Sequence, residues 1–189
     1  MNKMIRAALA ATAIVALAAP AFAATTSGTV IVNGTVAASC SAVTPITGTI
    51  TVNEMALTTG LVNTTFSNQS GGLTRDFQVL CTNANPKIQV SSDALHQTGV
   101  PTVSGYTGVV HYTSTLSADL AGGGTASTAY TTADVLPAAS STTLGATKYF
   151  ATGSNNLHVT ISAAHTTGAT DVLFAGNYTS TITITVSPS

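Results

Sequence analysis

Charged side chains are scarce in this chain of 189 residues, which has five Lys and Arg, six Asp and Glu, and no Trp. Charged residues make up 6% of the sequence, against about 25% in an ordinary soluble domain. If the N-terminal segment that holds Lys3 and Arg6 is removed, three basic and six acidic side chains remain. Three basic side chains cannot neutralise a phosphate backbone, so the composition argues against nucleic-acid binding.

Motifs for catalysis and for cofactor binding are also missing. The sequence has no G-x-S-x-G, no phosphate-binding loop and no dinucleotide fingerprint. No two histidines have a metal-ligand spacing, and none has a carboxylate at a suggestive distance along the chain. We therefore expect no enzyme, no cofactor and no metal site, and we interpret His158 as a surface residue. The four histidines are His96, His111, His158 and His165.

The first 23 residues predict a cleavable export signal. Lys3 and Arg6 give a basic start, an uncharged apolar run follows at 7–19, and the Ala-Phe-Ala sequence at 21–23 fits a signal peptidase site. The apolar run is shorter than the roughly 20 residues that a membrane anchor needs. We expect a mature protein that begins at Ala24, has no membrane span and is exported through the periplasm.

The rest of the chain is rich in Thr, Ser, Gly and Ala, and its patterns favour strands. Apolar and polar residues alternate in several short segments, as expected for strands with one buried face. About seven such strands joined by turns indicate an all-β antiparallel sandwich. We predict strands at 46–52, 76–82, 87–91, 109–116, 157–163 and 178–186, a hairpin turn at 83–86, and loops at 59–72 and 121–139. In the strand at 157–163, Ala163 is expected to share the inward face.

Two cysteines, Cys40 and Cys81, predict one disulfide in an exported chain. Cys40 shares a strand face with Val36, and Cys81 shares one with Phe77 and Val79, so both sulfurs would point inward. Closing a loop of about 42 residues would stabilise the fold by roughly 4 kcal/mol in the chain-entropy model. The alternative is two free buried thiols.

The disulfide has a simple test. Unfolded, unreduced protein is expected to contain no thiol that reacts with a thiol reagent, and reduction should release two. Thiols that react before reduction would support the alternative.

Residues 25–40, TTSGTVIVNGTVAASC, predict a strand at the very start of the mature protein. Because side chains alternate along a strand, this segment has one apolar face. Such an arm must bury that face either in its own core or in the core of another chain. The apolar face consists of Val30, Val32, Val36 and Ala38.

Three motifs together resemble the subunits of chaperone–usher pili, and most closely the archaic pilins of the spore coat protein U-like family. They are the arm GTVIVNGTVAASC, the segment FQVLCTNANPKIQVS with the second cysteine, and the terminal AGNYTSTITITVSP with its Gly176-Asn177-Tyr178. The resemblance covers both ends and the first half of the mature chain. One departure is that this chain ends in Ser187-Pro188-Ser189 rather than in an apolar residue.

The resemblance implies an incomplete immunoglobulin-like sandwich with an N-terminal donor strand. The signal peptide would be residues 1–23, the donor-strand arm 24–34 and the pilin-like domain 35–189, with 35–38 kept as part of the domain's own first strand. Donor residues would be Gly28, Val30, Val32 and Gly34. The edge of the acceptor groove would be formed by Tyr178, Ile182, Ile184 and Val186.

The implied function is a structural fimbrial subunit that polymerises by donor-strand exchange, for surface attachment or biofilm formation. Its partners would be copies of itself in a head-to-tail filament, a periplasmic chaperone and an outer-membrane usher. The alternative is a self-contained exported sandwich, such as a coat, matrix or carbohydrate-binding surface protein, whose arm pairs within its own chain. The low aromatic content, 5%, argues against a sugar-binding platform, which typically uses exposed rings.

Overall fold

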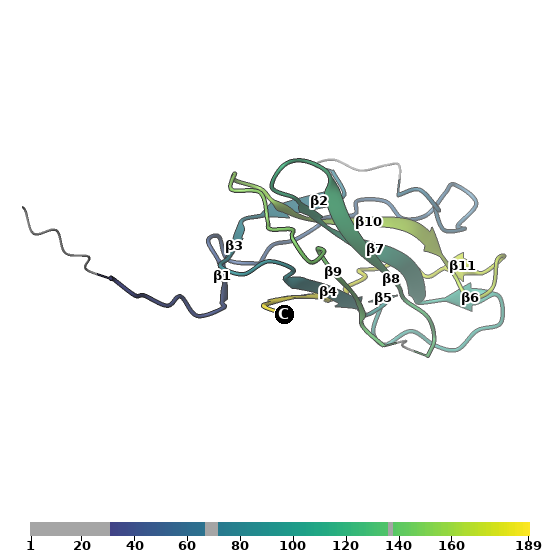
Figure 1. Cartoon of the computed structure of the whole chain (residues 1–189). Coiled ribbons are helices and arrows are strands. Elements are labelled where there is room, and N and C mark those ends of the chain that lie inside the picture. The colour runs from purple at the N-terminus through teal and green to yellow at the C-terminus, as the bar shows by residue number, and fades with distance from the viewer. Residues whose placement is uncertain (1–30, 67–71, 136–137) are drawn as a thin grey trace, which may run out of the picture. The chain divides into compact units, whose positions relative to one another are not determined.

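A computed structural model describes residues 31–66, 72–135 and 138–189, and these residues form an all-β antiparallel sandwich (Figure 1). They contain twelve strands and no helix, so no helix among them could cross a membrane. The chain divides into two units, residues 1–35 and 36–189, and all the strands belong to the second. The predicted export signal and the donor residues Gly28 and Val30 lie outside the described residues.

Two main sheets pack face to face, and two small strand pairs lie beside them. The larger sheet has the order β2–β10–β7–β5, and β8 also pairs with β7; the smaller has the order β12–β4–β9. β1 pairs with β3, and β11 pairs with β6 in the only parallel arrangement of the described strands. The strands are β1 (Cys40–Ala42), β2 (Thr74–Phe77), β3 (Val79–Cys81), β4 (Lys87–Ser92), β5 (Leu95–His96), β6 (Tyr106–Thr107), β7 (Val109–Asp119), β8 (Thr125–Thr131), β9 (Ser140–Thr143), β10 (Leu157–His165), β11 (Val172–Leu173) and β12 (Ile182–Ser187).

The core follows from the alternation of apolar residues along the long strands. In β4, Ile88 and Val90 are fully buried, and Gln89 between them is half-buried. β7 and β10 behave in the same way, so their predicted inward faces are confirmed except at Ala163, which is exposed. The large apolar residues that these two strands bury are Val110, Tyr112, Leu116, Leu157, Val159 and Ile161.

The two long sides of the sandwich differ. On one side β8 and β9 close the gap between the sheets, and the hydroxyls of Thr128 and Ser140 hydrogen-bond there at 2.8 Å. On the other side β12 and β2 are the edge strands of their sheets. No strand of the described residues pairs with the outer edge of either. The sandwich is therefore closed on one side and open on the other.

The predicted disulfide is confirmed. Cys40 and Cys81 are bonded and lie directly opposite each other in the β1–β3 pair, with their Cα atoms 4.1 Å apart. Cys81 is buried and Cys40 is half-buried. The bond therefore ties the first strand of the domain to β3.

The donor strand assigned to residues 24–34 would form on another chain and stays a prediction. In this chain residues 31–39 form no strand, because β1 begins only at Cys40. Residues 35–38 are therefore not part of the domain's first strand, and Val36 is 83% exposed. A strand forms only where its N–H and C=O groups find partners on a neighbouring strand. The alternating pattern was present here, but the partner was not.

Two other predicted strands differ for the same reason. Residues 46–52 form no strand, and β12 begins at Ile182 rather than at Tyr178. In the segment before β12, Thr179 makes only an isolated bridge to His96. These segments have suitable side chains, but no continuous neighbouring strand to bond.

The predicted hairpin across residues 83–86 is also wrong. β3 pairs with β1, whereas β4 pairs with β12 and β9, so the turn carries the chain from one layer to the other. Asn85 adopts a φ of 60° in this turn, and its Oδ1 accepts a hydrogen bond from the Gly145 N–H at 2.9 Å. The turn residues were correctly identified, but the side-chain patterns of β3 and β4 could not indicate which strand each of them pairs with.

Residues 121–139, predicted to be a loop, contain β8. Gly122, Gly123 and Gly124 have φ values of 86°, 97° and 86°, which glycine adopts without steric cost, and they make the turn between β7 and β8. β10 carries a bulge between Ser162 and His165. As a result Ala163 is exposed with a φ of 53°, and the neighbouring Ala164 is buried in its place.

β2 and β3 were predicted as one strand but are interrupted at Gln78, and the Asn156 side chain bonds the backbone just after the interruption. Its buried amide accepts a hydrogen bond from the Val79 N–H at 2.9 Å and donates to the Val79 C=O at 2.8 Å and the Ala151 C=O at 2.7 Å. The side chain thus replaces a neighbouring strand for the buried Val79 backbone.

We expect Asn156→Ala to destabilise the domain. Each buried group left without a partner costs about 1–3 kcal/mol, so the midpoint of chemical denaturation should fall clearly. Ser154→Ala changes an exposed neighbour and serves as the control, for which little change is expected. Equal midpoints for the two variants would show that the amide has no structural role.

Candidate functional site

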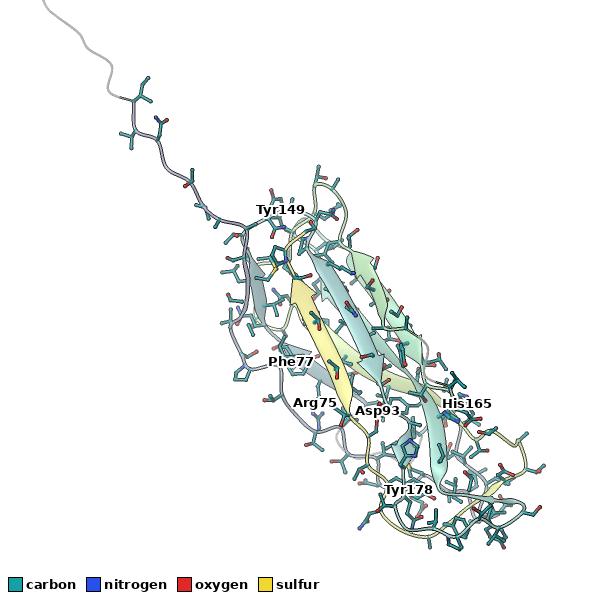
Figure 2. All side chains as sticks on the ribbon, turned by 90° about the horizontal axis from the view of Figure 1, so that it is seen from below. Arg75, Phe77, Asp93, Tyr149, His165 and Tyr178 are labelled. Atoms are coloured by element: carbon teal, nitrogen blue, oxygen red, sulfur yellow. A yellow bond between two sulfur atoms is a disulfide. The ribbon has the colours of Figure 1, made fainter. Side chains whose placement is uncertain are left out.

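An apolar groove runs along the free edge of β12. Its first part has a volume of about 340 Å³ and its second part about 260 Å³. Ile46 and Ile184 line both parts, so the two adjoin. Figure 2 shows the labelled Arg75 and Phe77 of β2 beside β12, and these two residues line the first part.

The four residues assigned to the groove edge lie together along this groove. Tyr178, Ile182 and Ile184 line the first part, and Ile184 and Val186 line the second. All four are half-buried. The hydroxyl of Tyr178 donates to the Phe174 C=O at 2.9 Å, which holds the ring just before β12 begins.

The opposite rim of the groove is formed by residues 46–52. Ile50 packs against both core clusters, as Ile182 does from β12. No backbone hydrogen bond joins residues 48–52 to any strand in the part of the chain that the structure describes. At Gly48, an added Cβ would meet only side-chain atoms of Arg75, at 3.7 and 3.9 Å. This rim is therefore held by side-chain packing, and its backbone from residue 48 to 52 is not paired with a strand.

The floor of the groove is the core itself. Phe77 from β2, together with Val159 and Ile161 from β10, reaches it from the larger sheet. A chain laid into the groove would find apolar side chains below it and unpaired backbone beside it. These are the requirements for binding an extended peptide by β-strand addition. Over the described ranges, no three His, Cys, Asp or Glu side chains are grouped so as to hold a metal ion.

Two of the four assigned donor residues, Val32 and Gly34, are described. Ile31 and Val32 are 77% and 89% exposed. No atom lies within 4 Å of the position that a Cβ would take at Gly34. The described part of the arm thus offers large apolar side chains that are in contact with solvent.

His158 has carboxylate partners that the sequence analysis missed. Its Nδ1 lies 2.8 Å from Asp76 Oδ1, and its Nε2 lies 3.2 Å from Asp119 Oδ2. The three residues come from neighbouring strands β2, β10 and β7, and they are 82 and 39 positions apart in sequence. His111 likewise hydrogen-bonds Asp134, at 3.0 Å. The fold brings these residues together, in the case of His158 by strand pairing, so spacing along the chain could not reveal them.

The pKa of His158 is raised above 6.5. Partial burial by itself would lower this pKa, but the hydrogen bonds and charges of Asp76 and Asp119 raise it by more. Asp76 stands between two groove residues, Arg75 and Phe77, in the edge strand β2. Protonated His158 therefore stabilises the attachment of β2, which forms one wall of the groove, to β10 and β7.

We found no significant match for this chain among protein-family models, curated proteins or solved structures. The fold and the groove are thus observations on this chain alone, and its family is a matter for proposal.

The raised pKa predicts a specific pH dependence. Because folded His158 binds its proton more tightly than the unfolded chain does, its contribution is complete below pH 6.5 and is lost as the pH rises through the raised pKa. The thermal midpoint of the wild type should therefore fall relative to that of His158→Gln over this interval. His96→Gln is the control, because His96 has no carboxylate partner among the described residues. Parallel pH profiles for the wild type and His158→Gln would contradict the prediction.

Proposed function

We propose that this chain is a structural subunit of a chaperone–usher pilus of the archaic, spore coat protein U-like type. One observation carries the proposal. β12 has an unpaired outer edge, and that edge lies along an apolar groove that opens into the core. The domain is then an immunoglobulin-like sandwich in which the place of one strand, between β12 and residues 46–52, is vacant.

The occupant that we propose is the N-terminal arm of another copy. Val30 and Val32 share one face of the arm, so both could enter the groove while Asn33 and Thr35 face outward. Burial of each large apolar side chain contributes about 1.5–3 kcal/mol before the costs of ordering the arm. Backbone bonds to β12 would set the register, because a slip of one residue would turn the valines outward.

Donor arm and acceptor groove are different surfaces of the same chain. An interface of this kind is head-to-tail, and it generates an open filament when its rotation does not close a ring. The chain needs no additional domain to polymerise. This supports a fimbrial role in surface attachment or biofilm formation rather than a catalytic one.

The open side of the sandwich also supports the proposed partners. A free strand edge that carries half-buried apolar side chains is an aggregation hazard. A periplasmic chaperone would cover the groove with a strand of its own until an outer-membrane usher exchanges it for the next arm. The disulfide favours this route, because the periplasm is an oxidising compartment.

The second candidate is a self-contained exported sandwich whose arm pairs with its own domain. That candidate requires the arm to form a strand in the groove of its own domain. The free edge of β12 could receive the arm of the same chain or that of another copy, and the assembly of the variants below distinguishes the two.

A charge on the inward face of the arm should block assembly. Val32→Asp is expected to leave the isolated subunit folded, since Val32 is 89% exposed, but to prevent filaments, because a carboxylate would have to enter an apolar groove without a partner. Thr35→Asp places the same charge on the outward face, and we expect it to assemble. Electron microscopy of both variants, co-expressed with chaperone and usher, provides the measurement.

A deletion complements this pair. Mature protein without residues 24–33 should form no filaments, whereas the same residues fused behind Ser189 through a flexible linker should fill the groove and raise the thermal midpoint. Filaments from the deleted chain, or from Val32→Asp, would refute donor-strand exchange.

A further inference from the structure

The arm contains the only Asn-Gly pair in the sequence, Asn33-Gly34. Both residues are exposed, and neither belongs to a strand. No atom lies within 4 Å of the Cβ position at Gly34, so nothing there restricts the backbone sterically. An asparagine amide and the following main-chain N–H thus occur together in an unpaired, solvent-exposed segment.

We propose that Asn33 is a site of spontaneous deamidation that marks unassembled subunits. The main-chain nitrogen of Gly34 loses its proton and attacks the Asn33 side-chain carbonyl carbon. The C–N bond of the side-chain amide breaks, ammonia leaves, and a five-membered succinimide forms. Water then opens the ring at either carbonyl, giving aspartate or isoaspartate, so the net change is addition of water and loss of ammonia.

Other asparagines lack one of these conditions. Asn85 precedes Pro86, whose nitrogen carries no hydrogen. Asn63 and Asn156 are buried. Asn177 is exposed, but the Cβ of the following Tyr178 hinders approach of the main-chain nitrogen, whereas Gly34 has no Cβ. The chain therefore contains its own set of internal controls.

Pairing of the arm would stop the reaction. In a strand the backbone of Asn33 is extended, with ψ near 135°, and the next N–H points away from the side-chain carbonyl. This part of the inference depends on the proposed function, since it takes donor-strand exchange as the event that pairs the arm. An assembled subunit would keep its asparagine, and an unassembled one would lose it with time.

Isoaspartate alters the main chain of the arm, whereas aspartate adds only a negative charge. Its main chain runs through the side-chain carbon, so one additional atom enters the backbone at position 33. Side chains on the two sides of that atom no longer alternate with the period that a strand requires. Val30 and Val32 would then be out of register with Gly34 and Val36. A subunit that carries isoaspartate should fail to serve as a donor.

The experiment begins with the purified mature subunit, incubated at neutral and at mildly alkaline pH. Peptide mass mapping and labelling by an isoaspartyl methyltransferase should show conversion at Asn33, faster at the higher pH, with Asn177 and Asn156 unchanged. Gly34→Ala should slow the conversion severalfold. An unmodified Asn33, or equal conversion at Asn177, would overturn the proposed site.

Assembly is tested separately on fresh and aged subunits. Aged wild type should lose the ability to polymerise, whereas Asn33→Gln aged in parallel and fresh Asn33→Asp, which has the charge without the longer main chain, should keep it. Filaments incubated in the same buffers should retain Asn33. Equal conversion in filaments and free subunits would refute protection by pairing, and failure of fresh subunits to form filaments would refute the proposed function while leaving the deamidation site intact.

Discussion

The structure depends on one unsatisfied constraint, the free edge of β12 beside the core. Backbone N–H and C=O groups need partners, and apolar side chains need cover. On the closed side of the sandwich β8 and β9 meet both needs, with Thr128 bonded to Ser140. On the open side neither need is fully met, because residues 46–52 form the opposite rim without pairing with β12, and Ile182 and Ile184 stay half-buried. A single additional strand would satisfy both at once.

Other features hold the walls of this groove in place. The Cys40–Cys81 bond anchors β1 where Cys40 and Val79 line the second part of the groove. Asn156 bonds both polar groups of the Val79 backbone. His158 connects β2, β10 and β7 through Asp76 and Asp119. These bonds hold the walls formed by β1, β2 and β3, so binding of an arm would have to order only the unpaired rim at residues 46–52.

The arm has the opposite character. Its described residues are exposed and unpaired, with Val32 in contact with solvent and Asn33-Gly34 open to attack. Pairing would change the chemistry of the arm as well as its conformation, since an extended backbone removes the geometry that succinimide formation needs. Assembly and chemical lifetime would thereby be coupled through the conformation of two residues. A groove with an unpaired edge and an exposed, unpaired arm are the two features on which the proposal of a polymerising subunit rests.

The amino-acid sequence by itself determined which residues face the core in β4, in β7 and in β10 up to its bulge, because alternation is a local property of the chain. It also determined the disulfide, because the chain has only two cysteines. It did not distinguish residues 46–52 from a true strand, since the same alternation occurs in both. It missed β8, the crossing at 83–86, and the partners of His158. These depend on which strands become neighbours, and a strand carries no local mark of its partner. Only the tertiary structure decided that β12 keeps a free edge, because this depends on how all the other described strands pair.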